Sequence, residues 1–138
     1  MRIFIIAALA CGLAGAALAA PDVDLTRFSL GLGAGQMYGE LGTNIEYRLD
    51  EQFAVSGGFG LNGDGNWFLG GRMYLKPAST ARTRSRITVG VATEEEGNRQ
   101  PTKLVVAVGG TWSNARNEFS GWNVDISTEG KISFGYSF

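Results

Sequence analysis

The chemistry open to this chain is limited first by the residue types that it lacks. Its 138 residues include no histidine, the commonest general base in enzymes and the commonest transition-metal ligand. The single cysteine is Cys11, and no base is spaced to activate a serine nucleophile. We therefore expect a non-catalytic protein with no metal site and no cofactor.

Two glycine-rich stretches suggest ligand-binding loops but lack the rest of the pattern. Residues 31–35 read GLGAG, yet the spacing differs from the dinucleotide fingerprint and no helix follows. Residues 62–66 read NGDGN but lack the later acidic ligands of an EF-type calcium loop. We interpret the first stretch as small residues on the inward face of a strand and the second as a hairpin turn.

Charge is concentrated in two short segments. Residues 76–86, KPASTARTRSR, are basic and predict a turn that either contacts anionic headgroups or cell-wall polymer or is simply solvated. Residues 94–97, EEEG, predict a second loop, at the opposite end of the strands from the basic turn. Its carboxylates either share divalent cations with lipid phosphates or simply keep that end of the protein soluble. The solvated interpretation is favoured for both. The net charge of −1 gives no reason to expect nucleic acid as a partner.

The elements that must position the remaining polar residues are β-strands. Apolar residues recur at every second position, and no segment after Ala20 keeps a helical period. The pattern predicts eight strands, over 27–35, 41–49, 53–61, 67–75, 86–93, 103–112, 121–127 and 131–138. The seventh strand has an alternative start at Phe119, and the sixth is apolar on both faces, which leaves its orientation open.

The two faces of these strands differ in size as well as in polarity. One face carries nearly all the large apolar side chains, and the other is mostly glycine, small residues and charge. So small a second face suits the inside of a narrow barrel, and the bulky face is then stable outside only in lipid. We predict an all-β, eight-stranded, antiparallel, up-and-down transmembrane β-barrel over residues 20–138.

Five charged residues fall on the inward face: Glu46, Arg48, Arg72, Arg86 and Asp125. Such charges are costly inside a narrow barrel unless they are paired. They form either a lumenal network that plugs or gates a small pore, or ion pairs that satisfy one another and fix strand register. The second interpretation is favoured. An alternative places Arg48 and Arg86 near the rims.

The first 19 residues have the pattern of a secretory signal peptide. Arg2 precedes a short apolar run that ends in small residues, and Ala17-Leu18-Ala19 is the predicted cleavage motif. Cleavage after Ala19 would also remove Cys11. The less favoured alternatives are a transmembrane helix and, because the residues before Cys11 loosely resemble a bacterial lipobox, lipidation of that cysteine.

The last eight residues read KISFGYSF, with Ile132, Phe134, Tyr136 and Phe138 on one face. This stretch resembles the C-terminal signature of bacterial outer-membrane β-barrels, in which the last strand is read by the barrel-assembly machinery and pairs with the first. With the signal peptide and eight amphipathic strands, the chain is similar to small barrels of the OmpA and OmpX class. The resemblance implies a Gram-negative outer membrane, a monomer in contact with lipids and lipopolysaccharide, and both barrel termini facing the periplasm.

These observations favour an integral outer-membrane protein with a structural or envelope-interaction role. The alternative is a narrow, charge-lined pore for ions or very small solutes, since the many inward glycines suggest an open water path. A lipid A-modifying enzyme and a soluble periplasmic β-domain are less favoured.

Overall fold

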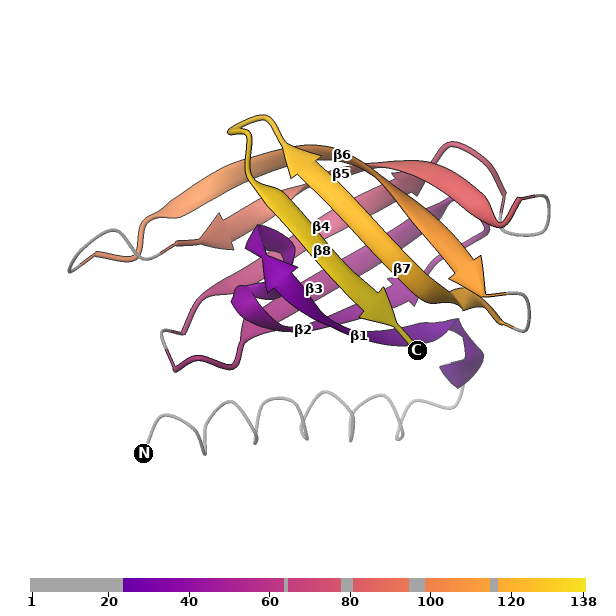
Figure 1. Cartoon of the computed structure of the whole chain (residues 1–138), viewed down its shortest axis with the longest axis horizontal. Helices are drawn as coiled ribbons and strands as arrows, with labels where there is room; N and C mark the ends of the chain where they lie inside the picture. Colours follow the sequence, from indigo (N-terminus) through magenta and orange to yellow (C-terminus); the bar gives the residue numbers. More distant parts are fainter. Residues whose placement is uncertain (1–23, 64, 78–80, 95–98, 115–116) are drawn as a thin grey trace.

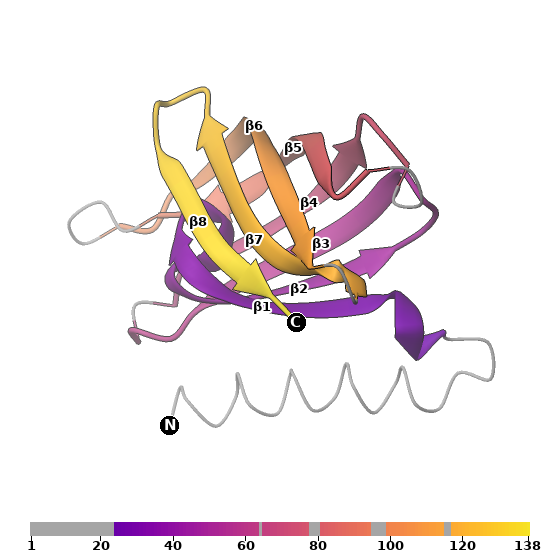
Figure 2. The same cartoon turned by 45° about the vertical axis from the view of Figure 1, so that its right-hand side comes forward.

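Eight antiparallel strands close into a barrel, as the sequence predicts (Figures 1 and 2). The computed structural model describes residues 24–63, 65–77, 81–94, 99–114 and 117–138. The strands pair in chain order, and the first pairs with the last. Their bounds are β1 (Phe28–Gly35), β2 (Glu40–Arg48), β3 (Phe53–Gly60), β4 (Trp67–Tyr74), β5 (Thr83–Thr93), β6 (Thr102–Asn114), β7 (Asn117–Ser127) and β8 (Ile132–Ser137). Two 3₁₀ turns, η1 (Leu25–Arg27) and η2 (Gln36–Tyr38), flank β1.

Closure depends on the pairing of β1 with β8. Leu32 lies opposite Tyr136 in this ladder, and the Phe138 amide donates a hydrogen bond of 2.8 Å to the Leu30 carbonyl. The start of β1 and the end of β8 lie at the same end of the barrel (Figure 1). We call this the terminal end and the opposite one the far end. Because β1 and β8 pair, neither presents an open edge to another sheet.

Side chains alternate between wall and lumen as the period of two predicts. In β1 the exposed positions Phe28 and Leu30 alternate with the buried Ser29 and Gly31. In β6, Val105 and Ala107 point inward while Leu104 and Val108 point outward, which settles the orientation of the strand that is apolar on both faces. The large apolar side chains therefore cover the outside of the barrel.

Three strands are longer than the sequence predicts. β5 begins at Thr83 instead of Arg86, β6 extends to Asn114, and β7 begins at Asn117, before either predicted start. The physical reason is that β5 pairs with β6 from Thr83 to Thr93, so polar residues before Arg86 are held in the ladder by their partners. A register shift between Ser113 and Asn114 marks an irregularity where β6 meets the start of β7.

At the terminal end, Asp50 stabilises the turn that joins β2 to β3. The Asp50 carboxylate accepts hydrogen bonds of 2.7 Å from the backbone amides of Gln52 and Phe53. The Leu49 amide in turn donates to the Phe53 carbonyl at 2.9 Å. Aspartate favours such a turn because its short side chain bonds to backbone two or three residues further on.

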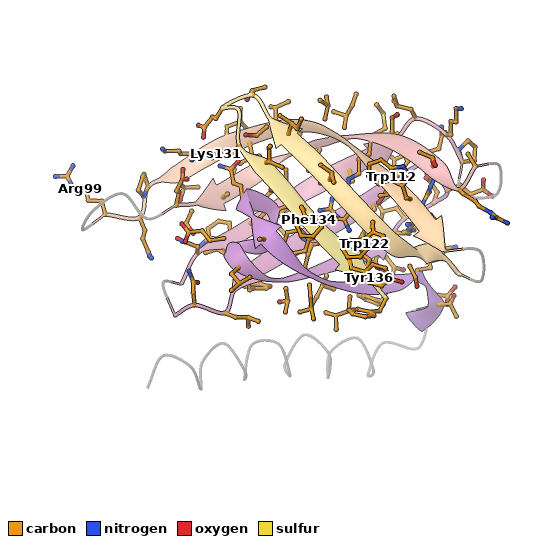
Figure 3. The ribbon with its side chains drawn as sticks, in the orientation of Figure 1. Arg99, Trp112, Trp122, Lys131, Phe134 and Tyr136 are labelled. Carbon is orange, nitrogen blue, oxygen red and sulfur yellow. The ribbon has the colours of Figure 1, made fainter. Side chains whose placement is uncertain are left out.

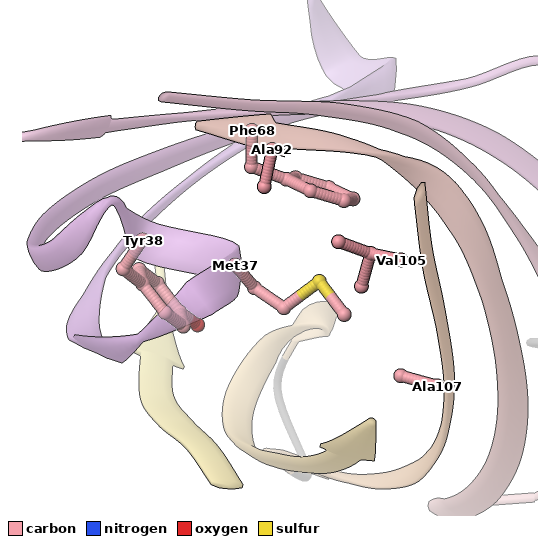
Figure 4. Close-up of a cluster of buried hydrophobic side chains, with 6 residues drawn as sticks. All are labelled: Met37, Tyr38, Phe68, Ala92, Val105 and Ala107. Carbon is pink, nitrogen blue, oxygen red and sulfur yellow. The ribbon is translucent and has the colours of Figure 1, made fainter. Parts of the chain in front are cut away.

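The link between β1 and β2 is not an external hairpin turn, because η2 folds into the lumen at the far end. Met37 and Tyr38 are each 1% exposed. They pack with Phe68, Val105 and two alanines into a buried cluster (Figure 4). The chain leaves η2 through Gly39 at φ 61° and Glu40 at φ 78°, both in the left-handed region. This plug is absent from the sequence-based expectations.

Candidate functional site

The charged half of the lumen lies toward the terminal end, opposite the η2 plug. The structure brings all five predicted lumenal charges into it, each 5% exposed or less: Glu46, Arg48, Arg72, Arg86 and Asp125. They come from β2, β4, β5 and β7. Alternation along each strand turns these residues inward, and closure of the sheet brings the strands to face one another across the lumen. Arg48 and Arg86, for which the alternative was a position near the rims, are both buried, and Arg48 is the last residue of β2.

Glu46 is the centre of the first polar cluster. Its Oε2 lies 2.6 Å from Arg72 Nη1, and its Oε1 lies 3.4 Å from Arg48 Nε. The Tyr74 hydroxyl donates a further hydrogen bond of 2.7 Å to Oε1. Two guanidiniums and a phenol thus surround one carboxylate, which offsets the cost of burying its charge.

Asn44 extends the first cluster toward the plug. Its Oδ1 accepts hydrogen bonds from Arg72 Nη1 at 3.2 Å and from Ser56 Oγ at 2.9 Å, and its Nδ2 donates to the Met37 carbonyl at 3.0 Å. One amide side chain therefore links the charged half of the lumen to the backbone of η2. This coupling depends on both the acceptor and the donor of an asparagine.

Arg86 and Asp125 form the second polar cluster. The guanidinium donates from Nε to Oδ1 at 2.9 Å and from Nη2 to Oδ2, which is the bidentate arrangement favoured between arginine and carboxylate. Gly109 lies opposite Asp125 in the β6–β7 ladder, and a Cβ on it would come within 2.3 Å of Oδ1. The absent side chain at Gly109 leaves the space that the carboxylate occupies.

Sequence reasoning missed Arg84, which is 1% exposed and belongs to the lumen. Its guanidinium lies 4.4 Å from the centre of the Tyr74 ring, and that of Arg48 lies 5.0 Å from the same centre. Both distances suit cation–π contact. The available signal was the continuation of the period of two from Thr88 back through Arg86 to Arg84. Placing this residue in a basic turn over 76–86 was wrong, although Lys76 and Arg82 of that segment are exposed.

The inward glycines near the far end do not leave an open water path. Added Cβ atoms would lie 2.8 Å from the Tyr38 ring at Gly33, 2.1 Å from the Met37 carbonyl oxygen at Gly58 and 2.2 Å from the Tyr38 hydroxyl at Gly135. These glycines are small because η2 passes against them. The alternative of a water path rested on their small size, and η2 occupies that space beside these three glycines.

The C-terminal signature lies on the outer wall. Ile132, Phe134 and Phe138 are exposed, and Tyr136 is half-buried among neighbouring aromatic rings. The ring of Trp122 stacks on Phe134 at 5.6 Å between centroids and meets Tyr136 edge-on at 5.1 Å. Figure 3 shows these rings on the face formed by β7 and β8, with Trp112 of β6 nearby.

A third charged group lies at the far-end rim. Glu94 Oε1 contacts the Lys131 ammonium, and its Oε2 lies 3.5 Å from Lys103 Nζ. The contact with Lys131 lowers the pKa of Glu94 and raises that of Lys131. The rest of the predicted acidic loop, residues 95–97, lies outside the described residues, as do residue 64 of the NGDGN turn and the predicted signal peptide with Cys11.

The described lumenal side chains offer charge and hydrogen bonding. The reactive groups of the first two clusters are held by one another, and the space between them amounts to about 10 Å³. Within the described ranges, no helix is long and apolar enough to cross a membrane. The chain matches no family model, and comparisons with curated proteins and with solved structures also find no match.

Proposed function

We propose that this protein is an integral β-barrel of the bacterial outer membrane with a structural or envelope-interaction role and no catalytic activity. One observation carries the proposal: the barrel has its large apolar side chains outside and its arginines and carboxylates inside. Leu104 is 67% exposed and Ile132 is 63% exposed, whereas Arg86 is 2% exposed. Water favours the opposite arrangement, and lipid favours this one.

The apolar wall also has a height that suits a thin membrane. In β6 the outward positions run from Leu104 to Trp112, which are both exposed. Eight residue steps at ~3.3 Å with a strand tilt near 40° correspond to about 20 Å along the barrel axis. Outer-membrane barrels carry an apolar band roughly 25 Å tall with aromatic residues at its edges. Trp112 and Trp122 face one another across β6 and β7 and supply aromatic residues toward the terminal end.

The partners proposed for this wall are the outer-membrane lipids, including lipopolysaccharide, and the protein is proposed to be a monomer. Of the rim lysines, Lys103 precedes the outward Leu104 within β6, and Lys131 immediately precedes the outward Ile132, the first residue of β8. That order along the strand is the one expected where a membrane wall meets headgroups. The assignment of the far end to the cell exterior follows from the family resemblance.

The conducting alternative has less support than the structural role. Met37 and Tyr38 fill the lumen at one end, and paired charges fill it at the other. The enzyme alternative has no support from the charged half of the lumen, since its cavity of about 10 Å³ cannot admit a lipid acyl chain.

The test is to express the full chain in a Gram-negative bacterium and to fractionate its membranes. We expect the protein in the outer membrane, where carbonate washing does not release it, and a shift in gel mobility between boiled and unboiled samples in detergent. Planar-bilayer recordings of the same preparation should show no steady conductance. A protein recovered in the soluble periplasmic fraction and folded without detergent would refute the membrane proposal, and stable current steps would favour the pore.

A further inference from the structure

A larger cavity lies at the far end of the barrel, beside the η2 plug. Its volume is about 320 Å³, against about 10 Å³ for the cavity in the charged half of the lumen. Ligand-binding cavities commonly start at roughly 300 Å³, so this one has room for a single small molecule. Its walls come from η2 and from the far ends of β2, β5 and β8, and they include Gln36, Glu40, Thr93, Glu94, Lys131 and Ile132.

The side chain of Gln36 is the unusual feature of this wall, because it is only 9% exposed and yet unpaired. Among the described residues, neither its Nε2 nor its Oε1 meets a hydrogen-bond partner. Buried amides are costly without partners, and nearly all of them in proteins are paired. Since Gln36 belongs to the cavity wall, a molecule bound there supplies the acceptor and the donor that this amide lacks.

The backbone on either side holds Gln36 in the wall before any ligand arrives. The Met37 amide donates to Ser133 Oγ at 3.1 Å, and the Met37 carbonyl accepts from Asn44 Nδ2 at 3.0 Å. The chain then turns to the rim through Glu40, the only non-glycine residue with a positive φ in the described part of the chain. Such strained positions cluster at binding sites, and a site formed in advance binds at lower cost.

The wall offers hydrogen-bond donors and acceptors side by side. The Gln36 amide supplies one group of each kind, and the carboxylates of Glu40 and Glu94 accept. The Lys131 ammonium donates, and its contact with Glu94 matches their charges within the wall. Anions only accept and ammonium ions only donate, whereas a hydroxyl does both. We propose that this cavity binds one neutral, hydroxyl-rich molecule the size of a sugar ring, hydrogen-bonded to the Gln36 amide.

The sugar has two possible sources, because the cavity is not sealed. Glu40 and Ile132 of its lining are exposed, so a ring enters either free or as the end unit of a larger glycan. The chemistry that recognises the ring is the same in both cases. The inference rests on the closed barrel and its plug, and it stands whether or not the barrel lies in a membrane.

The test is saturation-transfer nuclear magnetic resonance on the full-length folded protein, in a sugar-free detergent if folding requires one. The probes are D-glucose, D-galactose and D-mannose, each with its methyl glycoside, and acetate and methylammonium as charged controls. We expect saturable binding of at least one sugar that neither control displaces. Binding of the methyl glycoside as well indicates a linked sugar, and binding of the free sugar alone indicates a free one. Binding of no sugar, or displacement by a charged control, would overturn the proposal.

Two variants locate the binding. Gln36→Met keeps the length of the side chain and removes the amide, so it should weaken sugar binding about tenfold or more. The ligand-free variant should be at least as stable as the wild type in urea, because no unpaired amide is then buried. Gln52→Met, which alters an exposed glutamine at the terminal end, should keep full binding.

Full sugar binding in Gln36→Met, or a less stable ligand-free variant, would refute the assigned role of the amide. If that variant does not fold, wild-type crystals soaked in the tightest-binding sugar give the answer. A sugar ring in contact with Gln36 supports the proposal, and a cavity that holds only water refutes it.

Discussion

The ion pair between Arg86 and Asp125 allows a quantitative test of how the lumen is held together. Its side chains are 2% and 1% exposed, and the carboxylate accepts two hydrogen bonds from the guanidinium. Asp125→Asn keeps the shape but leaves the guanidinium without its opposite charge. Removing one partner of a buried pair costs about 3–5 kcal/mol, so we expect a loss of that size in the free energy of unfolding. The double variant Arg86→Met with Asp125→Asn should recover most of it, because no unpaired charge then remains.

The assay is urea unfolding of the folded barrel, followed by tryptophan fluorescence, with wild type, both single variants and the double variant compared as a cycle. Glu129→Gln is the matched control, since Glu129 meets Lys131 at 3.4 Å with both side chains more than one third exposed. Exposed pairs contribute roughly 0–1 kcal/mol, so this change should be nearly silent. A loss below about 1 kcal/mol in Asp125→Asn, or a double variant as unstable as the single, would refute the reasoning.

Three further changes probe the plug and the rim. Gly135→Ala places a Cβ 2.2 Å from the Tyr38 hydroxyl and should lower the free energy of unfolding in urea by about 1–3 kcal/mol. Gly57→Ala is the control, because its Cβ meets nothing closer than 3.8 Å, and it should cost clearly less. Equal losses in the two variants would contradict the packing of Tyr38 against Gly135. Replacing both Met37 and Tyr38 with glycine should remove the packing of the plug and cost at least about 2–5 kcal/mol in urea unfolding, and an unchanged stability would contradict the packing. Planar bilayers should still show no current steps, because paired charges fill the terminal half of the lumen. The hydrogen bond to Lys131 lowers the pKa of Glu94 in the folded state below its unfolded value of about 4.5. The contact therefore stabilises the folded state fully above pH 4.5, and this stabilisation is lost as the pH falls through the lower folded pKa. Glu94→Gln should therefore remove a small part of the acid-side loss of stability, and an unchanged pH profile would show that the contact contributes nothing.

The strands could be predicted because their signal is local. The alternation of Phe28, Ser29 and Leu30 already assigns each residue to the wall or the lumen, since neighbouring side chains in a strand point to opposite faces. The bounds of β5 and β7 could not be predicted in the same way. Thr83 lies in a strand because it pairs with Trp112 of β6. The sequence of residues 76–83 does not indicate that this pairing occurs.

The site was predictable in composition but not in pairing. The period of two placed Arg86 and Asp125 in the lumen, but it did not show that they bind each other across 39 positions of sequence. The same period of two extends back to Arg84. This residue was predicted to lie in a turn instead, because it belongs to a basic segment that contains a proline. Which carboxylate meets which guanidinium depends on the stagger of strands around the closed barrel.

The sequence by itself determined that this chain is an all-β barrel with a bulky apolar outside, because side-chain direction along a strand follows from residue spacing alone. Only the tertiary structure decided that η2 turns inward and closes the far end. Its Tyr38 hydroxyl donates to Asn123, and its Met37 amide donates to Ser133, 96 residues away. Glycines at 33, 58 and 135 look like empty space in the sequence. They pack against the plug only because β1, β3 and β8 are brought together around it in the closed barrel. Such packing depends on distances between strands, which residue spacing along one strand does not contain.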